Sequence, residues 1–91
     1  MVNYKIIFSS LADKDKKLLK QAGLEDKTKE LIDIISENPY KNPPIYEKLK
    51  GNLDGLISRR INIHHRLVYK VYEKEKKIFI VRMWSYYDKI K

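Results

Sequence analysis

The stretch that decides the fold is SRRINIHHRLVYKVY, residues 58–72, which mixes basic side chains with residues that favour β-strands. Isoleucine, valine and tyrosine recur at alternate positions, and the alternation breaks at His64 and His65. A period of two is typical of strands with one buried face, so the stretch predicts two antiparallel strands joined by a tight corner. Three interpretations of its basic residues stay open: a solvated strand surface, a nucleic-acid platform or an active site.

The sequence on either side predicts an α+β fold in which a strand and two helices precede a run of antiparallel strands. Residues 2–8 alternate apolar and polar side chains, as an opening strand does. A helix capped by Ser9 or Ser10 then ends at Gly23, and a second runs from about residue 26 to residue 37. The prolines between 38 and 44 predict a loop. The later strands are expected at 45–50, 56–62, 66–72 and 77–87.

Side-chain periodicity predicts which faces are buried. The apolar residues expected to face the core are Leu11, Leu18, Leu19 and Ala22 on the first helix and Leu31, Ile32, Ile34 and Ile35 on the second. The odd-numbered strand residues predicted to lie beneath the helices are Ile57, Ile61, Leu67, Tyr69, Val71, Phe79, Val81 and Met83. Arg59 does not fit this apolar face. The even-numbered residues predicted for the other, uncovered face are Ser58, Arg60, Asn62, Arg66, Lys70, Tyr72, Arg82, Trp84 and Tyr86.

Length and charge limit the class of protein. With 91 residues, the chain has the size of one small domain, which we expect to cover residues 1–91. It lacks cysteine, a secretory signal pattern and any long apolar run, which favours a cytoplasmic protein without a membrane span. The 20 basic residues against 12 acidic ones give a net charge of +8, which favours a polyanionic partner. Nucleic acid is the first expectation, and an acidic protein or an anionic membrane surface stays open.

The uncovered face has the chemistry of a single-stranded RNA surface. Guanidinium groups hold phosphates and aromatic rings stack on unpaired bases, and this face is expected to carry both. His64 and His65 would point apart on a strand and have no further ligands nearby in sequence, so no metal site is expected. No nucleophile elbow or glycine-rich phosphate loop occurs either. Glu47 is either a surface strand residue or, beside arginines, a proton acceptor for phosphodiester cleavage.

The segment YEKLKGNLDGLISRRINIHHRLVYKVY, residues 46–72, followed by RMWSYYD, residues 82–88, resembles the YoeB/Txe toxins of the RelE superfamily. The resemblance is specific because several separated blocks occur in the same order and at similar spacing. It implies a small antiparallel β-sheet with two N-terminal helices packed on one face. It also implies an endoribonuclease of a type II toxin-antitoxin system, which cuts mRNA in the ribosomal A site without a metal or cofactor.

The resemblance also implies roles for individual residues and partners. The expected catalytic residues are Glu47 as general base, Arg66 as stabiliser of the phosphorane, Tyr86 and the C-terminal Tyr87. The residues expected to contact RNA, counting those of the uncovered face, are Lys50, Arg59, Arg60, His65, Arg82 and Trp84. The expected partners are an acidic YefM/Axe-like antitoxin, the ribosome with its mRNA, and operator DNA through the antitoxin complex only. Whether two copies form a homodimer stays open.

One departure from the family pattern concerns the general acid. Tyr86 stands where relatives carry a histidine before the terminal tyrosine, so the family's HYD is here YYD. A phenol has a reference pKa of roughly 10, against roughly 6.5 for imidazole, and releases its proton less readily. The alternative interpretation is therefore a catalytically weakened homologue that binds RNA, the ribosome or, with its antitoxin, the operator.

Overall fold

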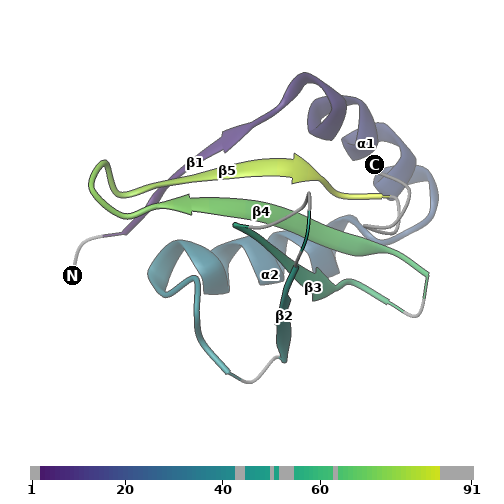
Figure 1. The fold of residues 1–91 in the computed structure, drawn as a ribbon. Helices are drawn as coiled ribbons and strands as arrows, with labels where there is room; N and C mark the ends of the chain where they lie inside the picture. The colour runs from purple at the N-terminus through teal and green to yellow at the C-terminus, as the bar shows by residue number, and fades with distance from the viewer. Residues whose placement is uncertain (1–2, 43–44, 50, 52–54, 63, 85–91) are drawn as a thin grey trace.

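The computed structural model describes residues 3–42, 45–49, 51, 55–62 and 64–84, which form two helices followed by most of a five-stranded sheet (Figure 1). The elements in chain order are β1 (Lys5–Phe8), α1 (Ser10–Gln21), α2 (Glu25–Glu37), β2 (Tyr46–Lys48), β3 (Leu56–Arg60), β4 (Arg66–Tyr72) and β5 (Lys77–Arg82). This order confirms the predicted α+β fold. Neither helix in these ranges has the length and apolar content needed to cross a bilayer.

The sheet has the order β1-β5-β4-β3-β2, so the first strand lies beside the last. Strands β2 to β5 pair antiparallel in succession, which confirms the predicted hairpins. Strand β1, however, pairs parallel with β5, which makes the sheet mixed rather than purely antiparallel. A parallel neighbour needs a crossover connection, and α1 and α2 belong to the segment that supplies it.

The ends of α1 follow the predicted capping chemistry. Ser9 is the N-cap: its Oγ accepts a hydrogen bond from the Ala12 amide (3.0 Å) and donates one to the Val81 carbonyl (2.7 Å). The serine therefore stabilises the helix start and also ties it to the end of β5. Gly23 adopts φ +73° just after the helix, where a residue without Cβ is favoured.

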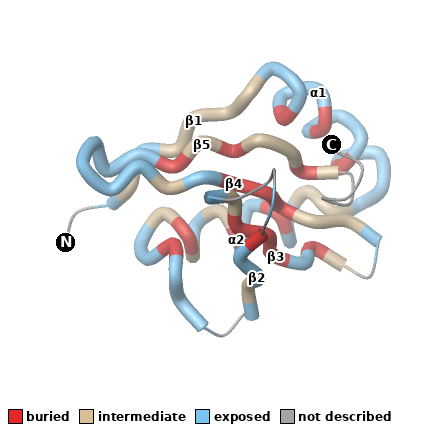
Figure 2. The backbone as a smooth tube through the Cα atoms, viewed as in Figure 1, coloured by how far each residue is buried: buried red, intermediate tan, exposed pale blue. Residues whose placement is uncertain are grey.

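Both helices pack on one face of the sheet, where Figure 2 shows buried segments of helix and strand meeting. The core there is formed by Ala12, Leu19, Leu31, Ile35, Ile57, Ile61, Leu67, Tyr69, Ile78, Ile80 and Met83. The predicted face of α2 is confirmed at Leu31 and Ile35. The predicted face of α1 is confirmed at Leu19 and wrong at Leu11 and Leu18, which are 48% and 38% exposed, and at the exposed Ala22. The helix instead buries residues spaced three and four apart, Ala12, Asp15 and Leu19.

A buried carboxylate explains the rotation of α1. Asp15 is 2% exposed, and its Oδ2 accepts hydrogen bonds from Arg82 Nε and from the Met83 amide, each at 3.0 Å. Its Oδ1 accepts a further one from the second Arg82 nitrogen at 3.3 Å. The spacing of apolar residues cannot predict the buried face of a helix when a charged residue of an ion pair belongs to that face.

The odd-numbered apolar face is confirmed on β3 and β4 and wrong on β5, whereas Met83, directly after β5, is buried in the helix-side core as predicted. Ile78 and Ile80 lie in the core under the helices, and Val81 packs on the opposite face. The four-residue turn from 73 to 76 pairs Tyr72 with Lys77, so odd residues of β4 face the same way as even residues of β5. A bulge opposite Val68 and Tyr69 then shifts the register again before Arg82.

Candidate functional site

The strand register places the predicted general base and the arginines on one face of the sheet. Glu47 on β2 pairs with Ser58 on β3, and Ser58 pairs with Val68 on β4. Arg60 and Arg66 pair with each other across β3 and β4. Paired residues point to the same side, and residues two apart on a strand share a face. These five side chains therefore form one patch on the face opposite the helices, which we call the β-face site.

The spacing within the β-face site suits a substrate that lies between its charged groups. Glu47 and Arg66 stand on strands separated by β3 and are offset by two residues along them, so their backbones lie about 12 Å apart. A carboxylate and a guanidinium reaching inward from that separation can bracket a phosphodiester and its ribose. Glu47 and Arg60 are exposed and Arg66 is half-buried, so all three are accessible from solvent. The paired arginines make this side of the site cationic.

An apolar cluster borders the β-face site. Leu49 and Val68 are buried and pack with Leu56 and Val81. Beside it lies a hollow of about 230 Å³ lined by Lys48, Leu49, Leu56 and other residues near β2. The hydroxyl of Ser58, directly across from Glu47, is buried and has no hydrogen-bond partner among the described residues. The cluster excludes water from one side of the site. The lower local dielectric constant there makes the attraction between Arg66 and a phosphate stronger than in water.

His65 and Trp84, both predicted to contact RNA, form a stacked pair where β4 begins. Their rings lie 3.8 Å apart with an interplanar angle of 22°, and His65 Nδ1 lies 2.7 Å from the Trp84 carbonyl oxygen. His65 is also adjacent in sequence to Arg66, and its amide donates to Asn62 Oδ1 at 2.7 Å. The pair therefore links the start of β4 to the residues that follow β5. Both rings are half-buried, and Trp84 packs against the helix-side core, so its predicted place on the uncovered face is wrong.

Arg59 does not belong to the β-face site. Its side chain is 0% exposed, which contradicts the expectation that it contacts RNA. It lies on the helix side of β3, where Nε donates to the Tyr69 hydroxyl (3.0 Å) and a terminal nitrogen donates to the carbonyls of Pro39 (3.1 Å) and Lys41 (2.8 Å). Burial raises the pKa of Tyr69, and the hydrogen bond from Arg59 opposes that rise.

Arg82 is also committed to the fold rather than displayed on the surface. Its guanidinium pairs with the buried Asp15 at 3.0 Å, and its side chain is 21% exposed. The expectation that Arg82 contacts RNA rested on its even-numbered position; the bulge restores its pairing with Val68, but Asp15 of α1 binds its guanidinium. We therefore leave Arg82 and Arg59 out of the proposed RNA surface.

Three predicted site residues, Lys50, Tyr86 and Tyr87, lie outside the described residues. The roles expected for them stay predictions. Within the described ranges, no group of three or more acidic or histidine side chains gathers closely enough to hold a metal ion.

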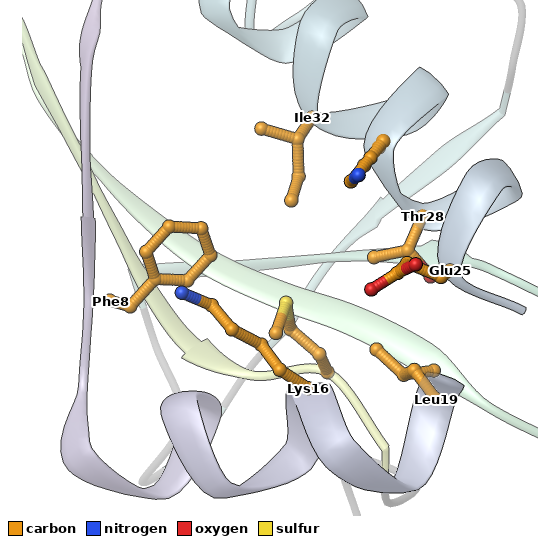
Figure 3. Close-up of a pocket in the computed structure, with 8 residues that line it drawn as sticks. Phe8, Lys16, Leu19, Glu25, Thr28 and Ile32 are labelled. Carbon is orange, nitrogen blue, oxygen red and sulfur yellow. The ribbon is translucent and has the colours of Figure 1, made fainter. Parts of the chain in front are cut away.

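A larger hollow, of about 240 Å³, lies on the helix side of the molecule between α1 and α2 (Figure 3). Its walls come from α1, α2, β1 and Met83, and Figure 3 shows the Lys16 side chain alongside Phe8. The Lys16 ammonium lies 3.8 Å from the Phe8 ring centre and 3.0 Å from Asp13. The hollow holds none of the predicted catalytic residues, so size alone does not identify the functional site.

Sequence reasoning missed the residues that support the site from beneath. Tyr69 was predicted only as a residue of the apolar face, and Tyr46 and the carbonyls around Pro39 were not singled out, although Arg59 had been noted as the one cation on that face. The sequence did contain a signal for this buried network: a charged residue at an otherwise apolar strand position, with a tyrosine on the neighbouring strand.

Comparison with known proteins places these features among bacterial toxins. Residues 7–87 match the family model described as the YoeB-like toxin of bacterial type II toxin-antitoxin systems. The chain is similar to the Toxin YoeB of Synechocystis, with 43% identity over 75% of this chain and 72% of the relative. It is also similar to the toxin structure in the YoeB-YefM complex from Staphylococcus aureus, with 38% identity, a TM-score of 0.78 and coverage of 92% of this chain and 98% of that one. The YoeB dimer from the same organism gives a TM-score of 0.79, 38% identity and coverage of 93% and 99%.

Proposed function

Because the chain belongs to the YoeB-like toxin family of bacterial type II toxin-antitoxin systems, we propose that it is a ribosome-dependent endoribonuclease that cuts mRNA in the A site. The observation that carries this proposal is the β-face site, where Glu47 and Arg66 share an accessible face at a spacing that fits a phosphodiester. The family indicates the class of reaction, and the strand register indicates which residues, Glu47 and Arg66, would carry it out.

Glu47 is the general base of the proposed reaction. Its carboxylate takes the proton from a ribose 2'-hydroxyl, and the 2'-oxygen attacks the adjacent phosphorus. Arg66, with Arg60 beside it, stabilises the negative charge that develops on the pentacoordinate phosphorane. The bond from phosphorus to the 5'-oxygen then breaks, leaving a 2',3'-cyclic phosphate on one fragment. The other fragment receives a proton at its 5'-oxygen, and the attacking group comes from the substrate itself, so no metal is needed.

Tyr86 is the proposed donor of that proton, and Tyr87 is the second phenol near it in sequence. A phenol holds its proton at neutral pH and is a weaker acid than the histidine of relatives. This substitution is the observation that favours the alternative function, a weakened toxin that acts by binding RNA or the ribosome. The two functions differ in whether a cleaved product accumulates.

The ribosome is the proposed partner that presents the substrate. The β-face site is an open patch on a small sheet, with three charged side chains and a dry border on one side. It has no second wall among the described residues that could bend an RNA strand into the geometry needed for 2'-oxygen attack. We therefore infer that naked RNA is cut poorly and that mRNA held on the ribosome is cut efficiently.

An acidic antitoxin is the proposed inhibitor. The net charge of +8 favours an acidic partner, and one similar toxin was solved in a YoeB-YefM complex. A segment that folds on the basic surface would bury the arginines and block the substrate. Operator DNA is then contacted through the antitoxin complex, and the similar YoeB dimer makes a homodimer of this chain a further proposal.

The test is single-turnover cleavage of mRNA on programmed ribosomes, with mapping of 5' ends and of the cyclic phosphate. Glu47→Gln keeps the shape of the side chain and removes the base, so the rate should fall by about 10²- to 10⁴-fold. The control is Glu30→Gln, an exposed residue of α2 on the helix side, which should cleave like the unmodified chain. Equal rates for Glu47→Gln and the control would exclude the proposed base. Ribosome binding without any cleaved product from the unmodified chain would favour the weakened homologue.

A further inference from the structure

Arg59 is buried, and burial of a charged guanidinium costs free energy unless its contacts compensate for it. These contacts show which parts of the fold the side chain stabilises. Its side chain is 0% exposed, and burial of a guanidinium is tolerated only where its donors are satisfied. Those donors reach Tyr69 on β4 and the carbonyls of Pro39 and Lys41 in the segment between α2 and β2. The Tyr69 hydroxyl donates to the same Pro39 carbonyl at 2.7 Å. Arg59 and Tyr69 together therefore fix the chain as it approaches β2.

A second set of contacts leads from Arg59 to β2 itself. Tyr46 is the register partner of Arg59, and the guanidinium carbon lies 5.0 Å from the centre of the Tyr46 ring. Attraction between a cation and an aromatic face holds the ring over the buried arginine. The Tyr46 ring also contacts that of Tyr40, with centres 6.4 Å apart. The first residue of β2 is thus held from below by a cation and from the side by a ring.

Strand β2 needs this support because it is short and lies at the edge of the sheet. It spans only Tyr46–Lys48 and pairs on one side, with β3. Short edge strands are held by few main-chain hydrogen bonds and open easily. Glu47 follows Tyr46 directly and points to the opposite face, so any shift of Tyr46 moves the proposed base.

We propose that Arg59 is a positioning residue, which fixes β2 through Tyr46 and the 38–42 segment and thereby sets the place of the Glu47 carboxylate. This inference rests on the proposed function of Glu47. Arg59 lies on the helix side of β3 and Glu47 on the opposite face, so Arg59 acts through the strand and not on RNA. A base must lie within hydrogen-bond reach of the 2'-hydroxyl, and a misplacement of about 1 Å can cost on the order of 10²-fold in rate.

The first measurement is cleavage on programmed ribosomes by Arg59→Met, with rates corrected for the folded fraction. The maximal rate should fall by about 10- to 100-fold, while the half-saturating ribosome concentration stays within about threefold. Arg59→Lys keeps the charge and should restore part of the rate. Leu31→Ala, a core variant of α2, is the control for lost stability and should cleave normally once folded. Tyr46→Leu removes the ring but keeps the arginine hydrogen bonds, so it tests the same link if Arg59→Met fails to fold.

The second measurement separates positioning from other effects. In a Glu47→Gln background, Arg59→Met should lower the residual rate no further, because a misplaced base and an absent base are equivalent. A full additional loss in that background would overturn the proposal.

The third measurement does not depend on activity. Hydrogen exchange of the peptide covering 45–49 should be at least about 10-fold faster in Arg59→Met, relative to a β4 peptide. Unchanged exchange there would also overturn the proposal. If the unmodified chain cleaves nothing on ribosomes, the proposed function fails, and the exchange of β2 alone then decides whether Arg59 fixes the strand.

Discussion

Removal of the Asp15 carboxylate should destabilise the protein more than any change to an exposed charge. The side chain accepts three hydrogen bonds, two from Arg82 and one from the Met83 amide, and joins α1 to the end of β5. In Asp15→Ala the buried Met83 amide loses its acceptor, which costs about 1–3 kcal/mol. Arg82 loses its counter-ion as well. Because its side chain is 21% exposed, that loss lies below the roughly 3–5 kcal/mol of a fully buried pair.

The expected total is a decrease of about 2–4 kcal/mol in the free energy of unfolding. For a domain of this size, that corresponds to a fall of about 10–25 °C in Tm. The assays are urea unfolding at neutral pH and thermal unfolding followed by circular dichroism. Asp15→Asn, which keeps one acceptor oxygen, should fall between Asp15→Ala and the unmodified chain.

The matched control is Asp13→Ala, two positions earlier on α1. Asp13 pairs with Lys16 at 3.0 Å, but its side chain is 58% exposed, so its removal should cost about 0.5 kcal/mol. The double variant of Asp15 and Arg82 should lose less than the sum of the two single losses, because each single change leaves the other partner uncompensated. A loss for Asp15→Ala no larger than that for Asp13→Ala would refute the reasoning.

Three further predictions concern other contacts. Ser9→Ala removes the α1 cap and should cost about 1–2 kcal/mol in urea unfolding, whereas Ser10→Ala should cost less than about 0.5 kcal/mol. Burial raises the pKa of Tyr69 in the folded protein, so its protonated hydroxyl stabilises the fold fully below the ordinary pKa of 10.0. This stability should decrease as the pH rises above that value, which unfolding curves at alkaline pH can measure. In Tyr69→Phe the decrease should be smaller. Because the chain has one tryptophan, its fluorescence should change in His65→Ala, which removes the stacked ring, and stay unchanged in His64→Ala.

The order of the elements could be predicted from the sequence because period and capping are local signals. Ser9, Gly23 and the alternation in 66–72 each depend on a few neighbouring residues. The orientation of elements depends on contacts between distant residues, and there the sequence was less informative. The exposed Leu11 and Leu18 show that an ion pair with Arg82 outweighs two leucines in setting the face of α1.

The site was predicted in part for a related reason. The shared face of Arg60 and Arg66 follows from alternation across one tight corner, and the structure confirms it. Arg82 was misplaced because its guanidinium pairs with Asp15 on a distant helix, a contact that no pattern within β5 reveals. Arg59 falls by parity on the apolar face, where the structure has it, and only the family resemblance implied that it contacts RNA. Its acceptors are main-chain carbonyls of a remote loop, which carry no sequence signal of their own.

The parallel pairing of β1 with β5 has a consequence for how the chain folds. Lys5 to Phe8 find their partners only in Lys77 to Ile80, and the Ser9 hydroxyl bonds a carbonyl 72 positions away. Contacts of such long sequence separation raise the contact order, and their loop entropy is lost before any pairing compensates it. The hairpins of β3, β4 and β5 can form first, whereas β1 can pair only after β5 is in place. During synthesis, a nascent chain therefore cannot complete its sheet until the β5 segment has emerged from the ribosome, so the first strand to be made is the last to be paired.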